Sequence, residues 1–253
     1  MSFFKTKKAK KEEIYDFTGL TLPAHIAIIP DGNRRWAKEK NLPVRLGHKE
    51  GAEAFRKIVK YSGKLGIKYI TFYAFSTENW KRDESEVKAL MDLLLRFLVK
   101  SDEELGEDKS KISIRVIGDR SKLSEELQKG IADIENETKD NTDIIVSIAI
   151  NYGGRAEIAD CVTKIAREIE NGNIKPDEIS EELINNNLYT KDIPDPDLLI
   201  RTSGEMRISN FLLWQLAYTE FYFADVYWPD FDSEQLDKAL WAYTKRQRRY
   251  GGT

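Results

Sequence analysis

The chain has 253 residues and a formal net charge of −3, with 41% hydrophobic and 33% charged residues. This balance suits a soluble protein with a sizeable apolar core, and the slightly acidic charge argues against a general nucleic-acid-binding protein. The one cysteine, Cys161, cannot form a disulfide within the chain and fits a reducing compartment. Because we find no signal peptide and no run of about 18 apolar residues, we expect a cytoplasmic protein.

Basic residues gather at both ends of the chain. The first cluster consists of Lys5, Lys7, Lys8, Lys10 and Lys11, and the second of Lys245, Arg246, Arg248 and Arg249. We interpret residues 1–18 as a flexible basic arm and residues 19–253 as one folded domain. An alternative role for the arm is transient attraction to an anionic membrane surface, although no lipidation motif accompanies it.

Strand-like and helix-like segments alternate along the chain. Apolar, β-branched or aromatic runs predict strands at 25–30, 69–75, 112–117, 144–150, 197–201 and 221–227. Helices are predicted near 48–66, 84–105, 121–138, 154–171, 177–187, 207–217 and 233–248. This alternation indicates a single α/β domain with a central, mostly parallel six-stranded sheet flanked by helices.

The predicted helix at 84–105 is unusually apolar. Between Val87 and Val99, the polar residues Lys88, Asp92 and Arg96 occupy one narrow stripe, and almost every other position is apolar. A surface helix normally has a single apolar face. The helix therefore either packs on two sides or lines a hydrophobic cavity, and its pattern alone favours the first interpretation.

The first predicted strand is followed by Asp31-Gly32-Asn33-Arg34-Arg35-Trp36. Ligands of open parallel sheets bind at the carboxyl ends of the strands, so this turn is a candidate site. Gly32 allows close backbone approach, and the two arginines supply donors suited to phosphate oxygens. Asp31 would repel a bare phosphate but can share a bridging Mg²⁺ ion with one. The simpler alternative is a strand-to-helix junction with Asp31 as the helix cap.

Two further strand ends carry polar turns. Ser76-Thr77-Glu78-Asn79-Trp80-Lys81-Arg82 follows the second strand, and the segment from Arg201 to Ser209 follows the fifth. The latter places two arginines, Arg201 and Arg207, and three hydroxyls around Gly204, as a second phosphate site requires. His48, at a predicted helix start, can donate to a phosphate oxygen. Each turn alone fits an ordinary loop, but three at three strand ends favour anion binding.

The sequence lacks the fingerprints of several other enzyme classes. We find no phosphate-binding loop, no dinucleotide-binding glycine pattern, no nucleophile elbow and no zinc-ligand spacing. The residues themselves therefore predict a magnesium-assisted enzyme with two phosphate sites beside a broad apolar surface.

The same segments closely resemble the cis-prenyltransferase family, and within it the bacterial undecaprenyl diphosphate synthases. The matching stretches span roughly residues 20 to 250 and are HIAIIPDGNRRWAK, LGHKEGAEAFRKIV, ITFYAFSTENWKR, IAINYGGRAEI, LLIRTSGEMRISNFLLWQLAYTEFYF and DVYWPDF. The resemblance implies a homodimer with a deep hydrophobic tunnel. It also implies Mg²⁺-dependent condensation of isopentenyl diphosphate onto an allylic diphosphate such as farnesyl diphosphate. The product would be undecaprenyl diphosphate, a lipid carrier precursor for cell-wall polysaccharides.

The resemblance also implies roles for individual residues. Asp31 would govern Mg²⁺, with Glu220 as a second metal-linked carboxylate near the dimer interface. The residues implied to bind the allylic diphosphate are Gly32, Asn33, Arg34, Arg35, Trp36 and His48. Those implied for isopentenyl diphosphate are Arg201, Arg207, Ile208 and Ser209. Those implied for a mobile loop are Ser76, Thr77, Glu78, Asn79, Trp80 and Arg82. Asn79 is the family's candidate for proton removal, but an amide is a very weak base, so we interpret it as orienting the substrate.

One position departs from the family pattern. Many members carry an arginine four residues before the histidine of the Gly-His pair, where this chain has Val44 followed by Arg45. A growing polyprenyl chain needs an apolar tunnel, so the resemblance also changes the interpretation of the helix at 84–105. We predict that Val87–Val99 forms one wall, that Ile144, Val146 and Ile148 contribute another, and that Ala74 leaves room for the product.

Other functions fit parts of the pattern. A magnesium phosphohydrolase could use Asp31 but would have no use for the apolar helix. A non-catalytic subunit of the same fold could dispense with Asp31 and Asn79, yet both are present. A synthase of shorter cis-prenyl chains shares every feature above. Contact with the inner face of a membrane during product release is an expectation from the chemistry of the product.

Overall fold

The computed structural model describes residues 15–100 and 106–246. Most of the predicted basic arm lies outside these residues, as do Arg248, Arg249 and the last five residues of the helix predicted at 84–105. Among the described residues, no helix is both long and apolar enough to cross a membrane.

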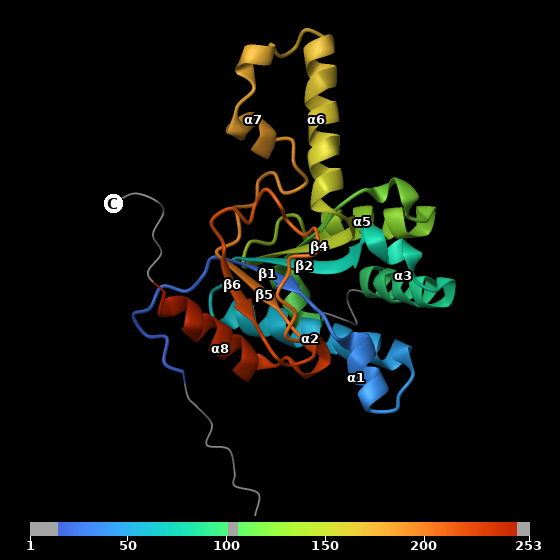
Figure 1. Ribbon diagram of the computed structural model, residues 1–253, viewed down its shortest axis with the longest axis vertical. Helices are drawn as coiled ribbons and strands as arrows, with labels where there is room; N and C mark the ends of the chain where they lie inside the picture. The colour runs from blue at the N-terminus through green and yellow to red at the C-terminus, as the bar shows by residue number, and fades with distance from the viewer. Residues whose placement is uncertain (1–14, 101–105, 247–253) are drawn as a thin grey trace, which may run out of the picture.

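Six strands form one sheet at the centre of the molecule (Figure 1). They are β1 (His25–Ile29), β2 (Tyr69–Ser76), β3 (Ile112–Ile117), β4 (Ile144–Tyr152), β5 (Leu198–Arg201) and β6 (Glu220–Phe223). Their order is β3-β4-β2-β1-β5-β6, and every pair of neighbours is parallel. The predicted sheet is confirmed, with β6 shorter than expected. Because all strands run the same way, all their carboxyl ends meet at one edge.

Seven α-helices and five 3₁₀ turns connect the strands in the described part of the chain. The helices are α1 (Asn33–Glu39), α2 (Val44–Lys64), α3 (Glu84–Val99), α5 (Glu125–Thr138), α6 (Gly154–Glu170), α7 (Glu181–Asn185) and α8 (Ser233–Thr244). The 3₁₀ turns are η1 (Thr77–Lys81), η2 (Gly106–Lys111), η3 (Arg120–Lys122), η4 (Pro176–Glu178) and η5 (Trp228–Asp230). The helix predicted at 177–187 is reduced to η4 and the single-turn α7.

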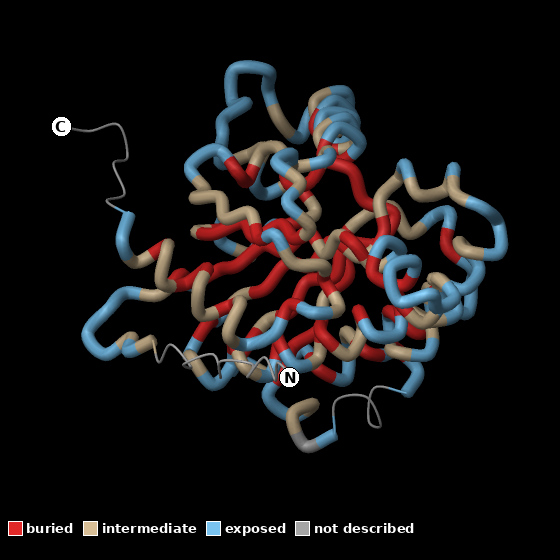
Figure 2. Tube along the Cα trace, turned by 60° about the horizontal axis from the view of Figure 1, so that its bottom comes forward, coloured by how far each residue is buried: buried red, intermediate tan, exposed pale blue. Residues whose placement is uncertain are grey.

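Buried side chains lie on both faces of the sheet, which forms the buried centre of the molecule (Figure 2). On one face, α2, α3, α5 and α8 cover a large cluster that includes Ile28, Phe72 and Ile200. On the other face, a smaller cluster joins Ala27 and Leu199 to the segment after β5. Both faces are thus covered, which explains why the strand sequences are continuous apolar runs.

The prediction of a helix at 207–217 is wrong. This segment is a series of turns in which Ser209, Asn210 and Leu212 have positive φ angles of 49°, 63° and 44°. Left-handed residues cannot continue a right-handed helix and cost about 1–2 kcal/mol each. The side chains of Phe211, Leu212 and Leu216 are buried against the second face of the sheet. Their spacing resembles a helical stripe, but they cover the sheet from an irregular loop.

Candidate active site

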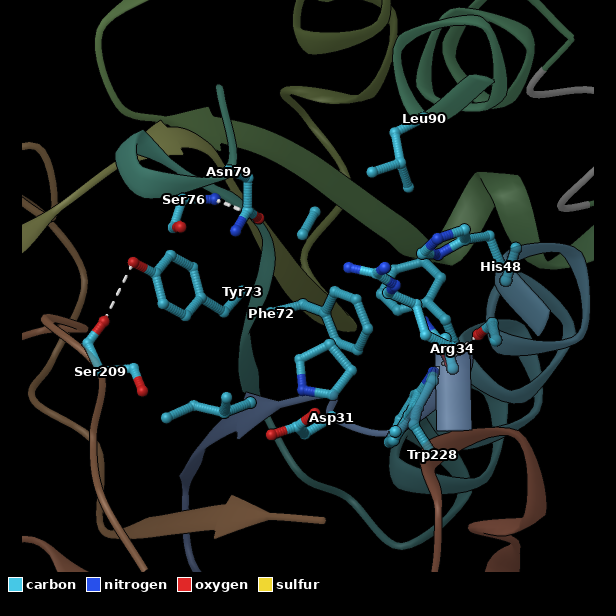
Figure 3. A pocket seen from close by; sticks show the side chains of 18 of the residues that line it. Asp31, Arg34, His48, Phe72, Tyr73, Ser76, Asn79, Leu90, Ser209 and Trp228 are labelled. Atoms are coloured by element: carbon cyan, nitrogen blue, oxygen red, sulfur yellow. Dashed lines mark hydrogen bonds between the residues drawn. The ribbon is translucent and has the colours of Figure 1, made fainter. Parts of the chain in front are cut away.

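A cavity of about 880 Å³ opens at the carboxyl edge of the sheet (Figure 3). One part of its lining is polar and comes from the segments after β1, β2 and β5, together with α2. The other part is apolar and comes from α2, α3 and the strands, and its members are Phe55, Phe72, Ala74, Leu90, Leu93, Leu94, Phe97 and Ile148. Figure 3 shows Arg34 and His48 on one side, Ser76 and Asn79 on the other, and Leu90 projecting from α3 above them. The three predicted polar turns therefore do converge on one site.

Asp31 is held in place by its main chain and its carboxylate. The Thr202 hydroxyl accepts from the Asp31 amide at 2.8 Å and lies 2.7 Å from its carbonyl oxygen, and the Ser203 hydroxyl donates to that oxygen at 2.8 Å. Arg35 donates to Oδ1 at 3.0 Å and Arg201 to Oδ2 at 2.9 Å. Burial raises the pKa of Asp31, but these arginine hydrogen bonds outweigh it and hold that pKa below its usual value.

The hydroxyls of the turn after β5 act differently from the sequence interpretation. Two of the three, those of Thr202 and Ser203, hold the Asp31 backbone. Among these three, only Ser209 lines the cavity, where its hydroxyl accepts from Arg201 at 2.7 Å. Arg201 is only 4% exposed, so it acts chiefly as the buried partner of Asp31 and Ser209.

A carboxylate that the sequence analysis missed links the two predicted phosphate sites. Glu205 accepts from Arg35 at 2.8 Å and also pairs with Arg207. Together with Asp31 and Arg201 it completes a continuous row of alternating charges across the mouth of the cavity. Because Arg35 and Arg207 remain 42% and 60% exposed, both stay accessible to an anionic ligand.

Glycines bring α1 and α2 close together at the other side of the mouth. Gly32 has a φ of 101°, and a Cβ there would lie 2.2 Å from the Ser203 hydroxyl. A Cβ on Gly47 would lie 2.1 Å from the carbonyl oxygen of Asn33. The close contact places Asn33, Arg34 and His48 on one wall. Trp36, predicted to bind substrate, is instead buried outside the cavity lining, and its indole donates to Asp230 at 2.8 Å.

Glu86, a second carboxylate absent from the sequence predictions, lies at the centre of this wall. Its side chain is 10% exposed and lies 3.1 Å from Arg82, 3.4 Å from His48 and 3.6 Å from Arg34. Burial lowers the pKa of His48 even though Glu86 opposes this shift. The spacing of four residues between Arg82 and Glu86 is visible in the sequence, but the contacts of Glu86 with His48 and Arg34 are not, because these residues lie in α2 and α1.

The segment after β2 is held by local hydrogen bonds. The Asn79 side-chain oxygen accepts from the Ser76 amide at 3.1 Å, which forms part of a capping box for η1. Ser76, Glu78, Asn79 and Arg82 line the cavity. Trp80 lies outside the lining, packs against the main core and donates to Asn151 at 2.7 Å. Thr77 and Ile208 also lie outside the lining.

Two residues stand apart from the site. Glu220 begins β6 at the amino end of the sheet, opposite Asp31, and accepts from Arg246 at 2.6 Å. Within one chain it therefore cannot share a metal ion with Asp31. Arg45, which follows the position where the family pattern has an arginine, is exposed and does not line the cavity.

The apolar wall agrees with the interpretation of α3 as the side of a cavity. Leu90, Leu93, Leu94 and Phe97 line the cavity, and only Leu98 of this helix is fully buried. Of the three β4 residues predicted to contribute, Ile148 lines the cavity, whereas Ile144 and Val146 are buried in the core and do not. Ala74 lines the cavity as predicted.

A cationic mouth that leads into an apolar cavity at the carboxyl edge of an α/β sheet defines a binding site for an amphiphilic anion. Comparison with protein families makes this class specific. The prenyltransferase family model for undecaprenyl diphosphate synthases matches residues 29–251. The chain belongs to this family of prenyltransferases.

Individual relatives cover nearly the whole chain. An isoprenyl transferase of Clostridium perfringens is 47% identical over 252 residues, which are 100% of this chain and 99% of the relative. A ditrans,polycis-undecaprenyl-diphosphate synthase of Aliivibrio fischeri, named as specific for (2E,6E)-farnesyl diphosphate, is 48% identical over 92% of this chain and 90% of its own length.

Solved structures share the fold. Lavandulyl diphosphate synthase from Lavandula x intermedia, in complex with dimethylallyl diphosphate, superimposes with a TM-score of 0.88 at 40% identity, covering 91% of this chain and 99% of that one. A probable undecaprenyl diphosphate synthase of Campylobacter jejuni gives 0.74 at 31% identity, covering 92% of this chain and 100% of that one.

Proposed function

We propose that this prenyltransferase uses Mg²⁺ to add isopentenyl diphosphate units, each with a cis double bond, to farnesyl diphosphate, and that its product is undecaprenyl diphosphate. The observation that carries the proposal is the single cavity with a cationic mouth and an apolar interior. An allylic diphosphate has the same two parts, a polyanionic head and a hydrocarbon tail. The names of the bacterial relatives support the same starter and product.

Two groups of residues at the mouth would each bind one of the two substrates. Arg34, Arg35 and His48 would hold the allylic diphosphate, and Arg207 and Ser209 would hold isopentenyl diphosphate. Fixed donors directed at a departing diphosphate stabilise the negative charge that develops on it. The double bond of isopentenyl diphosphate then attacks the allylic carbon, the carbon–oxygen bond to the diphosphate breaks, and loss of a proton leaves the new double bond. Holding both substrates side by side removes much of the entropic cost of this step.

The Asp31 carboxylate could hold a magnesium ion that is shared with substrate. Among the residues of the ranges 15–100 and 106–246, no group of three or more His, Cys, Asp or Glu side chains could hold a metal by itself. Mg²⁺ is commonly bound by one or two carboxylates together with substrate phosphates, so a single carboxylate beside the anion site is sufficient. Asp31 is the proposed ligand, and the ion would neutralise charge on the diphosphate.

The apolar part of the cavity would receive the growing chain. Each buried methylene contributes about 0.8 kcal/mol, so transfer of the hydrocarbon from water into the cavity favours elongation. The insoluble product must leave for a bilayer, and we therefore place the enzyme in the cytoplasm with transient contact at the inner face of the membrane. The proposed role of the product is that of the lipid carrier for cell-wall polysaccharides.

We also propose a homodimer. Strand β6 lies at the edge of the sheet, where its residues are only half-buried and Phe221 and Phe223 form a ring pair with centroids 6.2 Å apart. Exposed strand edges are commonly protected by pairing or covering. Glu220 begins this strand, so any role for it at the diphosphates would require a second copy of the chain.

Product analysis tests the proposal. Purified protein is incubated with radiolabelled isopentenyl diphosphate and farnesyl diphosphate, with Mg²⁺ or with a chelator, and the lipid products are separated by chain length. We expect a ladder that ends near the eleven-unit product and disappears with the chelator. Release of inorganic phosphate alone would indicate a hydrolase, and the absence of any reaction would indicate a non-catalytic subunit. Dimethylallyl diphosphate as a second starter tests whether the enzyme is a short-chain synthase instead.

A further inference from the structure

Asn210 occupies an unusual place in the loop after β5. It lines the cavity, directly follows Ser209, and has a φ of 63° in the left-handed region. Asparagine adopts this conformation more readily than most residues because its short side chain can form local hydrogen bonds. The contacts of Asn210, however, are with two other segments of the chain.

Asn210 caps helix α6 from outside. Its carbonyl oxygen accepts from the Gly154 amide at 2.7 Å, and its side-chain Oδ1 accepts from the Arg155 amide at 2.9 Å. The N-cap position of α6 is Gly153, which has no side chain to satisfy these amides. Asn210 thus does for α6 what a serine or aspartate at the cap normally does.

The side-chain NH₂ group of Asn210 contacts the segment after β2. Asn210 Nδ2 donates to Glu78 Oε1 at 3.1 Å. The backbone amide of Arg155 can only donate, so Oδ1 must face α6 and the NH₂ group must face Glu78. Thr77 donates to the second oxygen, Oε2, at 3.1 Å. Both carboxylate oxygens are therefore held by loop donors.

The three segments meet with no spare room. A Cβ on Gly153 would lie 2.8 Å from both Asn210 Nδ2 and Thr77 Oγ1. The φ of Gly153 is −163°, an extended conformation that any residue adopts. A methyl group on Gly153 would therefore force the Asn210 or Thr77 side chain to shift, although the backbone conformation would accept any residue.

We propose that Asn210 is a positioning residue that holds η1, through Glu78, against the loop that carries Arg207 and Ser209, and so fixes the direction of the Glu78 carboxylate beside the site proposed for isopentenyl diphosphate. This inference rests on the proposed function. Burial raises the pKa of Glu78, but hydrogen bonds that include those from Asn210 and Thr77 hold it below its usual value. The carboxylate is therefore an anion beside a site for anions. Without the Asn210 contact the carboxylate is free to turn towards the bound isopentenyl diphosphate and repels it.

A double-mutant cycle tests the contact. Asn210→Asp keeps an oxygen for the α6 cap but replaces the donor to Glu78 with a negative charge. We expect the KM for isopentenyl diphosphate to rise about tenfold or more, in line with the loss of a hydrogen bond to a charged group, while kcat changes much less. In a Glu78→Gln background, where the residue at 78 can donate to the new aspartate, the same substitution should change KM by less than about twofold.

Gly153→Ala provides a second test without any change of charge. Its methyl group pushes Asn210 and Thr77 apart, so we expect the same rise in KM and faster hydrogen exchange of the 77–82 amides. The matched control is Gly63→Ala, at an exposed position of α2 whose nearest neighbour lies 4.0 Å away, and it should leave both readouts unchanged.

Equal effects of Asn210→Asp in the two backgrounds would overturn the proposal, as would an unchanged KM in either Asn210→Asp or Gly153→Ala. A parallel loss of kcat and melting temperature with constant KM would assign Asn210 a purely structural role and would also refute it. Hydrogen exchange of 77–82 does not depend on turnover. If the wild-type enzyme transfers no prenyl group, this readout still decides whether Asn210 holds η1, separately from the failure of the proposed function.

Discussion

Asp31 is the proposed metal ligand and also pairs with a buried arginine, and the two roles can be separated by experiment. Its carboxylate accepts from Arg35 and from Arg201, and Arg201 is 4% exposed. Asp31→Asn removes the charge that balances this buried arginine. We expect prenyl transfer to fall on the order of a hundredfold or more. Stability should fall by about 2 kcal/mol, below the range for a fully buried pair because the Asp31 side chain is 27% exposed.

Steady-state rates and urea unfolding measure these two effects. Asp92→Asn is the matched control, since Asp92 is exposed on α3, and it should alter neither quantity. An Asp31→Asn enzyme with wild-type turnover would remove Asp31 from the mechanism.

His25, which is remote from the site, should make the stability of the protein depend on pH. It is 2% exposed, with Nδ1 2.6 Å from the Pro194 carbonyl oxygen and Nε2 2.8 Å from the Thr71 hydroxyl. Burial lowers its pKa from 6.5 to about 4. The folded state therefore favours the neutral ring. The contribution of His25 to the free energy of unfolding is complete above the unfolded-state pKa of 6.5 and is lost as the pH falls towards the folded-state pKa of about 4.

The expected loss from His25 is about 2 kcal/mol of unfolding free energy between about pH 7.5 and pH 5. Urea unfolding at both pH values checks it by comparing the wild type with His25→Gln, which cannot titrate there. The wild type should lose about 2 kcal/mol more than the variant over this interval. Equal pH dependence of the two proteins would contradict the assignment of a neutral buried ring.

At the scale of elements, the contact between α1 and α2 shapes the anion site. Gly47→Ala places a methyl group about where the Asn33 carbonyl oxygen lies, because the two would be only 2.1 Å apart. One helix must then move. We expect overpacking to lower the free energy of unfolding by roughly 2–3 kcal/mol. The free energy of binding to inorganic diphosphate, measured by calorimetry, should fall by a larger fraction of its wild-type value. Gly63→Ala again serves as control, and undiminished diphosphate affinity in Gly47→Ala would contradict this view of the site.

Most regular elements could be predicted from local patterns, whereas the loops could not. The six strands were found because strands buried on both faces form continuous apolar runs, of which Ile26–Ile29 is an example. The helix predicted at 207–217 failed because Phe211, Leu212 and Leu216 have a helical spacing but serve an irregular loop. The spacing of apolar residues indicates which side chains are buried, but it does not indicate where the backbone is left-handed.

The same distinction applies to the site. Asp31 and Arg35 could be paired from the sequence because they lie four residues apart at the start of a helix. The contacts of Glu205 with Arg35, across 170 residues, and of Asn210 with Glu78, across 132, could not be predicted, because the partners lie in other elements. The contacts of Glu86 with His48 and Arg34 are of the same kind, although its pairing with Arg82 has the local spacing of four residues. An acidic residue near a helix start has no sequence feature that identifies such a partner.

At the scale of the whole molecule, the direction of the strands separates the two ends of the sheet. Arg201 ends β5 beside the cavity, whereas Glu220 begins β6 at the opposite end. The resemblance implies that Asp31 governs Mg²⁺ and that Glu220 is a second metal-linked carboxylate near the dimer interface, and within a single chain the two lie at opposite ends of the sheet. One chain therefore supplies the arginines and the apolar wall that line the cavity, whereas the role proposed for Glu220 would require the assembly.

A bulge in β2 directs Ala74 into the cavity. Tyr73 pairs with Ala149 and Phe75 with Ile150, so Ala74 is an extra residue that has no partner on β4. Bulges often occur beside active sites, where they change the direction of a side chain. Phe72, Ala74 and Leu90 all line the cavity, and alanine is the smallest of the three. A larger side chain at position 74 would therefore narrow the cavity between the sheet and α3.

Ala74→Leu narrows this space and should shorten the product. The added side chain occupies the path of the growing hydrocarbon, so each further unit must displace it or leave part of the chain in water. We expect the ladder of lipid products to shift towards shorter chains while the first condensation continues. Chromatography of the labelled lipids measures the shift. Ala159→Leu on the exposed face of α6 is the matched control. An unchanged ladder from Ala74→Leu would mean that the hydrocarbon does not pass this strand.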